Sequence, residues 1–263
     1  MGVCFLDDAL LAGKMDAQSY IFLVRLMTMA LGHYDRERVI ADSTWFQGIP
    51  KPGLDTLVQA SHIKHLTAGK YLYQAGVTVT GCYCLLSGRL RISMMSEFGQ
   101  TFAVTDLDPL FWLGDDCWLP EESRGIEAQA QVDSDVLVIP RRVVLELGNK
   151  YPILYRNLFV EAGQRRRHIY ELMGSMVFYP LRARLAVRVV ALVAEHGTER
   201  DDGICLGIKL SQNDFASLCL GSRQRVNKIF REWTDQDILA LQGDHYVIYD
   251  LNRLKAEINV QGV

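Results

Sequence analysis

The stretch from Leu210 to Trp233 constrains the fold of this chain most strongly, because its pattern is that of two short helices joined by a tight turn. Ser211 and Asp214 have the spacing of a capping box at the start of the first helix. Leu220 and Gly221 form the break, and Gly221 is expected to take a positive φ there. The stretch therefore predicts a helix-turn-helix.

The second predicted helix has one apolar and one basic face. Its apolar residues recur at helical spacing and predict a buried stripe, made of Val226, Ile229, Phe230 and Trp233. The other face suits the major groove of DNA, where Arg or Lys bridges guanine and Gln or Asn bridges adenine. The candidate DNA-binding residues are Ser222, which is also the expected helix cap, Arg223, Gln224, Arg225, Asn227 and Lys228. A merely solvated helix is the alternative, and the preceding helix and turn favour DNA binding.

Length and charge distribution fit two domains with different roles. The chain has 263 residues, of which 49% are apolar, enough for more than one core. Residues 151–263 hold 15 Lys and Arg against 13 Asp and Glu, a net charge of +2, whereas residues 1–150 have a net charge of −5. The positive half contains the two-helix motif, as expected for a partner of DNA. No uncharged apolar stretch is long enough for a membrane span, so a membrane is not an expected partner.

The sequence shows no catalytic or metal-binding constellation. Its six cysteines are scattered without a CxxC pair, which favours structural thiols in a reduced, cytoplasmic protein. Cys82 and Cys84 are expected to share one face of a strand and to pack there. The six histidines do not cluster, and no nucleotide-binding glycine motif, GxSxG or HExxH is present. We expect neither enzymatic activity nor a metal site.

Changes in the residue pattern along the chain predict an α+β fold in four segments. Residues 1–42 are expected to form an amphipathic helical extension, because acidic residues precede the apolar run where a signal peptide would be basic. Residues 43–145 contain short alternating runs between Gly and Pro turns, which predict an antiparallel sandwich or barrel. Residues 146–178 contain a long helix. Residues 179–263 contain the helix-turn-helix and a following hairpin, the wing of a winged helix.

The long helix, expected from Tyr151 to Val177, carries a candidate dimer seam. Its apolar residues lie near heptad spacing and are Leu154, Leu158, Ala162, Ile169, Leu172 and Met176. The triplet Arg165-Arg166-Arg167 interrupts this pattern. Two interpretations of the triplet stay open, a solvated charged face and a contact with a ligand or partner.

Four sequence words and this order of elements resemble the Crp/Fnr family of bacterial transcription factors, from residue 43 to the C-terminus. The words are Trp45-Phe46, Gly69-x-x-Leu-Tyr-x-x-Gly76, Leu86-Ser-Gly-x-Leu-Arg91 and Leu218-x-x-x-Ser-Arg-Gln-x-Val226. The resemblance implies a jelly-roll sensor domain of the cyclic nucleotide-binding kind, a dimerisation helix, and a homodimer that binds palindromic double-stranded DNA at promoters and works with RNA polymerase. It also implies base-reading roles for Arg223, Gln224 and Lys228.

The nucleotide-binding cassette of that family is present only in part. Gly114 and Arg124 match it, whereas Asp115 replaces a glutamate and Gly125 replaces a hydroxyl residue. Each hydrogen bond lost in a buried site costs about 1–3 kcal/mol. Cyclic nucleotide stays open as a ligand, but an ion pair of Arg124 with a nearby acid is favoured, and the sensor is expected to serve another ligand or none.

A second class of function is also compatible with a sensor domain of this kind. The same sensor fold also occurs in regulatory modules that bind cyclic nucleotide and have no DNA-directed function. The cysteine cluster of FNR and the N-terminal haem-ligand pattern of haem-dependent members are both absent, so no certain cofactor is expected. Salt-sensitive DNA binding distinguishes the transcription factor from the regulatory module.

Overall fold

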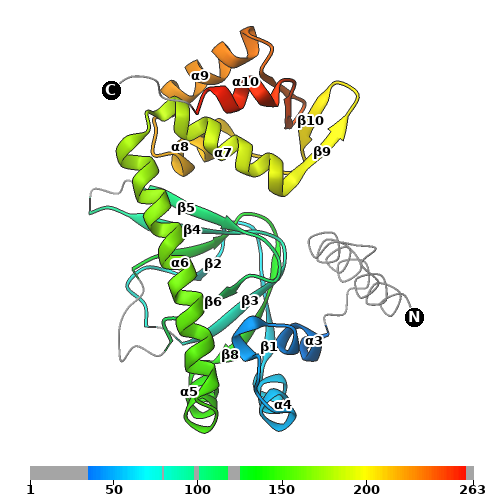
Figure 1. Cartoon of the computed structure of the whole chain (residues 1–263). Helices are drawn as coiled ribbons and strands as arrows, with labels where there is room; N and C mark the ends of the chain where they lie inside the picture. The colour runs from blue at the N-terminus through cyan, green and yellow to red at the C-terminus, as the bar shows by residue number, and fades with distance from the viewer. Residues whose placement is uncertain (1–34, 79, 98–100, 118–124, 259–263) are drawn as a thin grey trace. The chain divides into compact units, whose positions relative to one another are not determined.

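Two compact units make up the protein in a computed structural model (Figure 1). The residues that the structure describes are 35–78, 80–97, 101–117 and 125–258. Residues 1–91 and 106–162 belong to the first unit, and residues 92–105 and 163–263 belong to the second. The predicted extension over residues 1–42 lies mostly outside the described residues, and its last part contains the helix α3 (Arg36–Ala41).

The strands that follow form the predicted β-sandwich of two four-stranded sheets. One sheet has the order β1-β8-β3-β6, with β1 (His62–Leu66), β8 (Ser134–Pro140), β3 (Gly81–Ser87) and β6 (Trp112–Leu113). The other has the order β2-β7-β4-β5, with β2 (Tyr71–Tyr73), β7 (Glu127–Ala130), β4 (Leu90–Met95) and β5 (Thr101–Leu107). Strand β3 is buried from its first residue to Leu86, because it pairs with a strand on each edge and is covered on both faces.

Helical elements pack against this sandwich and share its core. They are α3, the 3₁₀ turn η1 (Thr44–Phe46), α4 (Lys51–Ala60), α5 (Arg141–Lys150) and the start of α6 (Ile153–Phe178). Trp112 lies 5.7 Å from the ring centre of Trp45 and 5.1 Å from that of Phe46. Large aromatic side chains bury the most apolar area per residue, so this trio is central to the stability of the first unit.

Not every Pro and Gly of residues 43–145 lies in a turn, because Pro50, Pro52 and Gly53 form the start of α4. Pro52 lies in the first turn of the helix, where a missing N–H costs no hydrogen bond. Gly53 is buried, and a Cβ atom there would lie 2.6 Å from Ile49 and 2.8 Å from Tyr151. The glycine therefore serves close packing of a helix rather than a turn.

The buried position expected for Cys82 and Cys84 is confirmed, since both are fully buried in β3. The Sγ atom of Cys82 lies 3.4 Å from that of Cys117, and the described cysteines are free thiols. The hydrogen bond with Cys117, together with burial, raises the pKa of Cys82 well above its ordinary value. With its pKa raised, the Cys82 thiol stays protonated and acts as a small apolar group.

The base of α6 is anchored in the first unit. Leu154 and Leu158 are buried in its core, and the amide of Asn157 donates to the backbone carbonyls of Trp45 (3.1 Å) and Gln47 (2.8 Å). The predicted dimer seam is therefore wrong at Leu154 and Leu158, because these residues pack inside their own chain. The prediction fails at these two residues because α6 has two apolar faces. The sequence does not show which face packs inside the chain and which is left for a partner.

The second unit contains the predicted winged helix-turn-helix. Its elements are α7 (Leu181–His196), β9 (Gly197–Arg200), β10 (Gly203–Leu206), α8 (Gln212–Leu218), α9 (Arg223–Asp235), β11 (Leu239–Gln242), β12 (His245–Ile248) and α10 (Leu251–Ala256). The sheet order is β11-β12-β10-β9. Strand β10 pairs with β9 in antiparallel register, with Ile204 opposite Glu199. Among the described residues, no helix has the length and apolar character needed to cross a membrane.

Arg182, at the start of α7, joins three helices of this unit. Its guanidinium donates hydrogen bonds to Glu257, just beyond α10, and to Glu232 of α9, and it lies 5.6 Å from the ring centre of Trp233. The hydrogen bond with Arg182 lowers the pKa of Glu257. This ion-pair network fixes α9 and α10 against α7.

We predict that Glu257→Gln lowers the melting temperature at neutral pH by about 4 °C. Because the pKa of Glu257 is lowered in the folded state, its stabilisation is complete above the ordinary value of 4.5 and is lost as the pH falls through the lowered value. Thermal melts across pH 3–7 should therefore show the wild-type advantage shrinking in acid. An advantage that is constant with pH would contradict the role of the ion pair.

Candidate nucleic-acid interface

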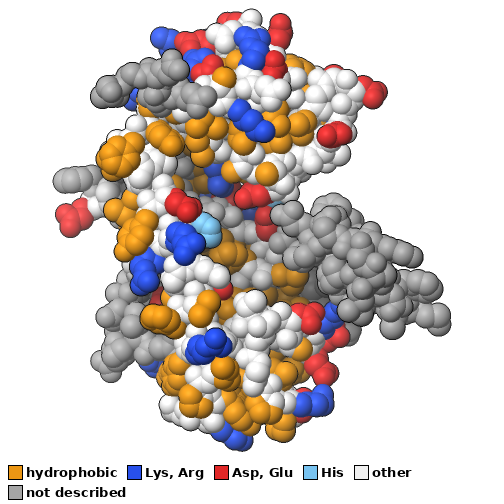
Figure 2. All heavy atoms as spheres, viewed as in Figure 1, with side chains coloured by type: hydrophobic (Ala, Val, Ile, Leu, Met, Phe, Trp, Pro, Cys, Tyr) orange, Lys and Arg blue, Asp and Glu red, His pale blue; other side chains and the backbone are white. Residues whose placement is uncertain are grey.

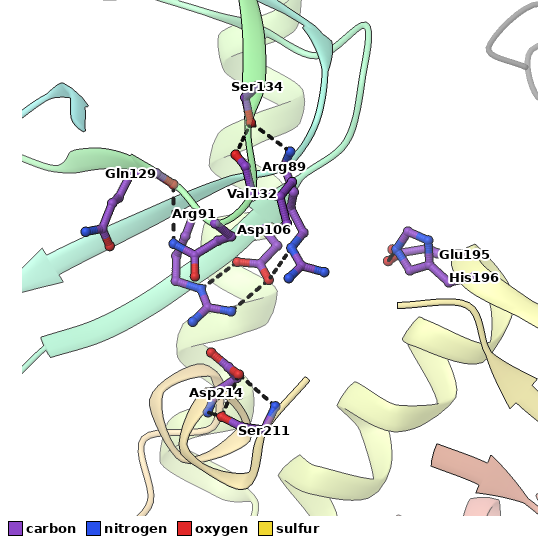
Figure 3. A network of polar contacts seen from close by, with 11 residues as sticks. Arg89, Arg91, Asp106, Gln129, Val132, Ser134, Glu195, His196, Ser211 and Asp214 are labelled. Carbon is purple, nitrogen blue, oxygen red and sulfur yellow. Dashed lines mark hydrogen bonds and ion pairs between the residues drawn. The ribbon is translucent and has the colours of Figure 1, made fainter. Parts of the chain in front are cut away.

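The first helix of the motif, α8, begins with the capping box that the sequence predicted (Figure 3). The hydroxyl of Ser211 accepts a hydrogen bond from the backbone N–H of Asp214 at 3.2 Å. The carboxylate of Asp214 accepts one from the backbone N–H of Ser211 at 2.7 Å. The two residues satisfy each other's backbone groups, so α8 has a defined start despite its length of seven residues.

The turn between α8 and α9 differs from the expectation at Gly221. Leu220 takes the left-handed conformation, with φ of 48°, whereas Gly221 does not. Gly221 is needed for space instead, because a Cβ atom there would lie 2.7 Å from the buried side chain of Leu181 on α7. The small size of Gly221 thus lets the turn pack closely against α7. The strained left-handed conformation falls on Leu220 instead.

The second helix of the motif, α9, presents its apolar stripe to the core, as predicted. Val226, Phe230 and Trp233 are buried, and Ile229 packs partly against the same cluster. Phe230 lies 5.0 Å from the ring centres of both Phe215 and Tyr246, so helices α8 and α9 and strand β12 meet at one aromatic group. Aromatic pairs at this spacing are stabilising beyond the area that they bury.

This packing leaves the basic face of α9 in solvent. Ser222 caps the helix, its hydroxyl accepting from the backbone N–H of Arg225 at 3.3 Å. The predicted DNA-binding residues are exposed with the exception of Asn227, which is half-buried; the exposed ones are Ser222, Arg223, Gln224, Arg225 and Lys228. Arg231 adds a further exposed cation one turn along. An exposed basic helix beginning at a capped N-terminus is suited to the negative charge of DNA phosphates.

Asn227 has an internal contact that the sequence did not reveal. Its amide donates to the side-chain oxygen of Gln212, the first residue of α8, at 2.6 Å. Gln212 in turn hydrogen bonds with Tyr246 of the wing, whose pKa is raised by burial and lowered in part by that contact. Asn227 therefore links α8, α9 and the wing. Neighbouring amides on two helices give no periodic signal, so sequence reasoning could not find this link.

The tip of the wing carries an ion pair. The ammonium of Lys209 lies 2.7 Å from the carboxylate of Asp244, in the turn between β11 and β12. The hydrogen bond from Lys209 lowers the pKa of Asp244. The pair offsets the one acidic side chain of that turn, which would otherwise repel a nearby phosphate.

The sensor residues of the predicted cassette are only partly within the described structure. Arg124 lies outside the described residues, Gly125 is exposed, and Asp115 is half-buried in the turn after β6. Gly114 has a φ of 96°, and a Cβ atom there would lie 2.6 Å from the carbonyl oxygen of Gly81. Close approach of two backbones therefore explains Gly114 without any ligand.

The motif from Leu86 to Arg91 in the sensor domain has a structural role. Arg91 of β4 makes two parallel hydrogen bonds with Asp106 of β5, at 2.7 and 2.9 Å (Figure 3). The Nε atom of Arg89 lies 3.9 Å from the same carboxylate. These side chains are largely buried, so the bidentate pair holds β4 and β5 together rather than presenting a free charge.

Comparisons with known proteins agree with this arrangement. The cyclic nucleotide-binding domain family matches residues 63–151, and the Crp-like helix-turn-helix domain family matches residues 183–257. Together these matches span the β-sandwich and the winged helix described above. The chain belongs to the Crp/Fnr family of DNA-binding transcriptional regulators.

Individual relatives are distant but extend over most of the chain. A CRP-like cAMP-activated global transcriptional regulator of Mycobacterium tuberculosis is 20% identical, over 83% of this chain and 97% of its own length. The anaerobic regulatory protein of Bacillus subtilis is 21% identical, over 73% and 81%. Among solved structures, the c-di-GMP-responsive global regulator CLP of Xanthomonas campestris has a TM-score of 0.67 and 13% identity, covering 76% of this chain and all of that one.

We predict that Gly221→Ala destabilises the protein by about 1 kcal/mol, because the added methyl group displaces the buried side chain of Leu181. Leu220→Gly should be neutral or stabilising at the adjacent position, since glycine adopts the left-handed conformation without strain. Urea unfolding of the two variants checks this order. The reverse order would mean that the turn has another conformation.

Proposed function

We propose that this protein acts as a homodimer that binds palindromic promoter DNA through α9 and there regulates transcription. The observation that carries the proposal is the exposed basic face of α9, held by a buried aromatic stripe and preceded by a capped α8. A helix presented in this way fits the major groove, where its N-terminal residues reach base edges. The alternative, a regulatory module without DNA-directed function, gives no account of this face.

We assign three different roles in DNA binding to the residues at and after the start of α9. Arg223, Gln224 and Lys228 are exposed near the N-terminal end of the helix and are assigned to base reading. Ser222 and Arg225 are assigned to the phosphate backbone. Asn227 is assigned to positioning, because its amide is already engaged by Gln212.

The dimer is assigned to the outward face of α6. Phe159, Tyr170, Met173 and Val177 are exposed by 73, 63, 57 and 73% on this helix. A row of exposed apolar side chains on a single helix is stabilised by a second copy that covers it. For a dimer with a two-fold axis, we expect a DNA site of two half-sites about 34 Å apart, one helical turn of the duplex. This account replaces the seam predicted through Leu154 and Leu158.

The cellular setting follows from the same class of function. Members of the family are transcription regulators rather than enzymes. We assign the protein to the cytoplasm, with RNA polymerase as its partner at the promoter. The free, buried thiols of the described cysteines agree with a reducing compartment.

Cyclic AMP is not assigned as the effector. The names of the relatives differ here, one being cAMP-activated and another c-di-GMP-responsive, so similarity alone selects no ligand. In this chain, Asp115 and Gly125 lack the longer carboxylate and the hydroxyl of the family's cassette. We propose that specific DNA binding occurs without cyclic AMP.

We predict that Arg223→Ala reduces the preference for specific over random DNA by about ten- to hundredfold, because a bidentate contact to guanine is lost. The DNA site is first selected from a random library with purified protein, with and without cyclic AMP. Affinities for the selected and a random duplex then give the preference. Arg231→Ala removes the same charge from the same helix and should lower the salt slope by about 1 without changing the preference.

An unchanged preference in Arg223→Ala, with intact helical content, would contradict base reading by Arg223. Binding that is insensitive to salt in the wild-type protein would contradict the DNA interface as a whole.

We also predict that the double variant Asp115→Glu, Gly125→Ser binds cyclic AMP about tenfold more tightly than the wild-type protein, since a lost hydrogen bond is restored. Gly125 has room for the change, because a Cβ atom there meets no heavy atom within 4 Å. Calorimetric titration measures both affinities. Tight binding by the wild-type protein would show that its own cassette works.

A further inference from the structure

Strand β1 is an edge strand whose side chains are exposed on both faces. Among the described residues it pairs only with β8, so its other edge has no neighbouring strand. The four residues from His62 to His65 are exposed, and Leu66 alone is buried. A free edge of this kind is open to pairing with another chain, and folded proteins commonly cover it with a segment of their own.

One row of side chains across the sheet shows where the cover of the first unit ends. Cys84 of β3 lies opposite Leu137 of β8, and Leu137 lies opposite Ile63 of β1, so the three side chains share one face of the sheet. Cys84 and Leu137 are fully buried in the core that the sheet shares with the helices, whereas Ile63 is exposed by 43%. In the part of the chain that the structure describes, the helical layer therefore ends before β1.

The border of this uncovered strand is apolar. Helix α4 leads directly into β1, and three of its residues, Leu54, Val58 and Ala60, are half-buried against the same core. Figure 2 shows apolar side chains at the surface around α4 and α5, between charged ones. An apolar segment over Ile63 would therefore extend a core that already exists.

The chain contains an apolar segment of suitable length before α3. Residues 20–31 lie outside the described residues, and ten of these twelve residues are apolar, with Arg25 as the one charged residue. An exposed apolar run of this length is unfavourable in water and is stabilised by contact with an apolar surface. Strand β1, with five residues, is about 17 Å long, so twelve residues suffice to follow it from end to end.

The position of α3 brings this run close to β1. Three residues separate the run from Asp35, whose carboxylate caps α3 by accepting a hydrogen bond from the backbone N–H of Arg38. In the first turn of α3, the guanidinium of Arg36 donates to the carbonyl oxygen of Ser61, the residue before β1, at 2.6 Å. Four residue steps span at most about 14 Å, so Leu31 stays within that distance of Asp35.

We propose that residues 20–31 cover the free edge of β1 and the side chain of Ile63, and so act as an internal cap of the first unit. The charges on both sides agree with this position. Residues 1–19 contain three Asp and one Lys, a net charge of −2, and β1 exposes Lys64. Opposite charges at this distance favour docking of the segment. The proposal depends neither on the homodimer nor on DNA binding.

The test is the rate at which a maleimide labels a cysteine placed at Ile63. Ile63→Cys is introduced with Cys4→Ser, and the described native cysteines are buried, so the new thiol is the reactive one. The rate is measured in the full chain and in a chain that lacks residues 1–31. We expect labelling about tenfold slower in the full chain, because the cap must open before the thiol can react.

Val77→Cys is the matched control, because Val77 of the same unit is also exposed by 43%. Its labelling rate should be the same in the full and the shortened chain. Equal rates at Ile63→Cys in the two chains would overturn the proposal. Equal protection at both positions would also overturn it, since the cover would not be specific to β1.

A second pair of variants avoids shortening the chain. Leu23→Asp with Leu26→Asp places two charges inside the apolar run, and Ile63→Cys should then react as fast as in the shortened chain. Gln18→Asp with Ser19→Asp adds the same two charges just before the run, and protection should remain. Loss of protection in both double variants would mean that added charge, rather than the apolar run, controls access to β1.

Dilution and lipid distinguish the chain's own segment from other occupants of the edge. Protection by a segment on a three-residue tether is independent of protein concentration, because its effective concentration is fixed by the tether. Protection that disappears on dilution would assign the edge of β1 to a second copy. Protection that requires vesicles of phosphatidylglycerol would assign the apolar run to a membrane surface. Either result overturns the internal cap.

Discussion

Burial of one aromatic stripe decides what the second unit does. Phe230 packs against Phe215 and Tyr246, and Val226 and Trp233 extend the stripe along α9. A helix has a fixed angular period, so once these residues are inside, the polar residues between them must be outside. The orientation of the basic face toward solvent is thus a consequence of core packing. The basic surface and the hydrophobic core are two faces of the same helix, so the packing of the core sets the direction in which the surface points.

Sequence reasoning was most successful where a short segment carried several agreeing signals. The helix-turn-helix combined a capping box, a break and a helical period, and the structure has these features at the predicted residues. The sequence also predicts the β-sandwich, but Pro50, Pro52 and Gly53, residue types that favour turns, lie at the start of the helix α4. Proline and glycine mark a helix start as well as a turn, and only the packing of Gly53 against Ile49 and Tyr151 distinguishes the two. Contacts between distant residues, such as that of Asn227 with Gln212, leave no periodic trace and could not be predicted.

Helix α6 shows how one sequence pattern can serve two purposes. Its apolar residues occupy nearly the whole circumference, so the strongest heptad-like series ran through Leu154 and Leu158, which the first unit buries. Another set of apolar residues on the same helix stays exposed, namely Phe159, Tyr170, Met173 and Val177. The pattern alone therefore could not tell which apolar face of α6 packs inside the chain and which is left for a partner.

The hydrogen bond between Asn227 and Gln212 affects how much conformational entropy the protein would lose when it binds DNA. It fixes α9 relative to α8, and the contact of Gln212 with Tyr246 extends the same constraint to the wing. In the proposed complex with DNA, these contacts hold the exposed face of α9 in position before DNA arrives, so docking requires less ordering of the backbone. Preorganisation of this kind reduces the conformational entropy lost on association. The strength of the complex is then governed by the fit between the duplex and a rigid surface, so a DNA site that must bend to meet that surface bears most of the deformation.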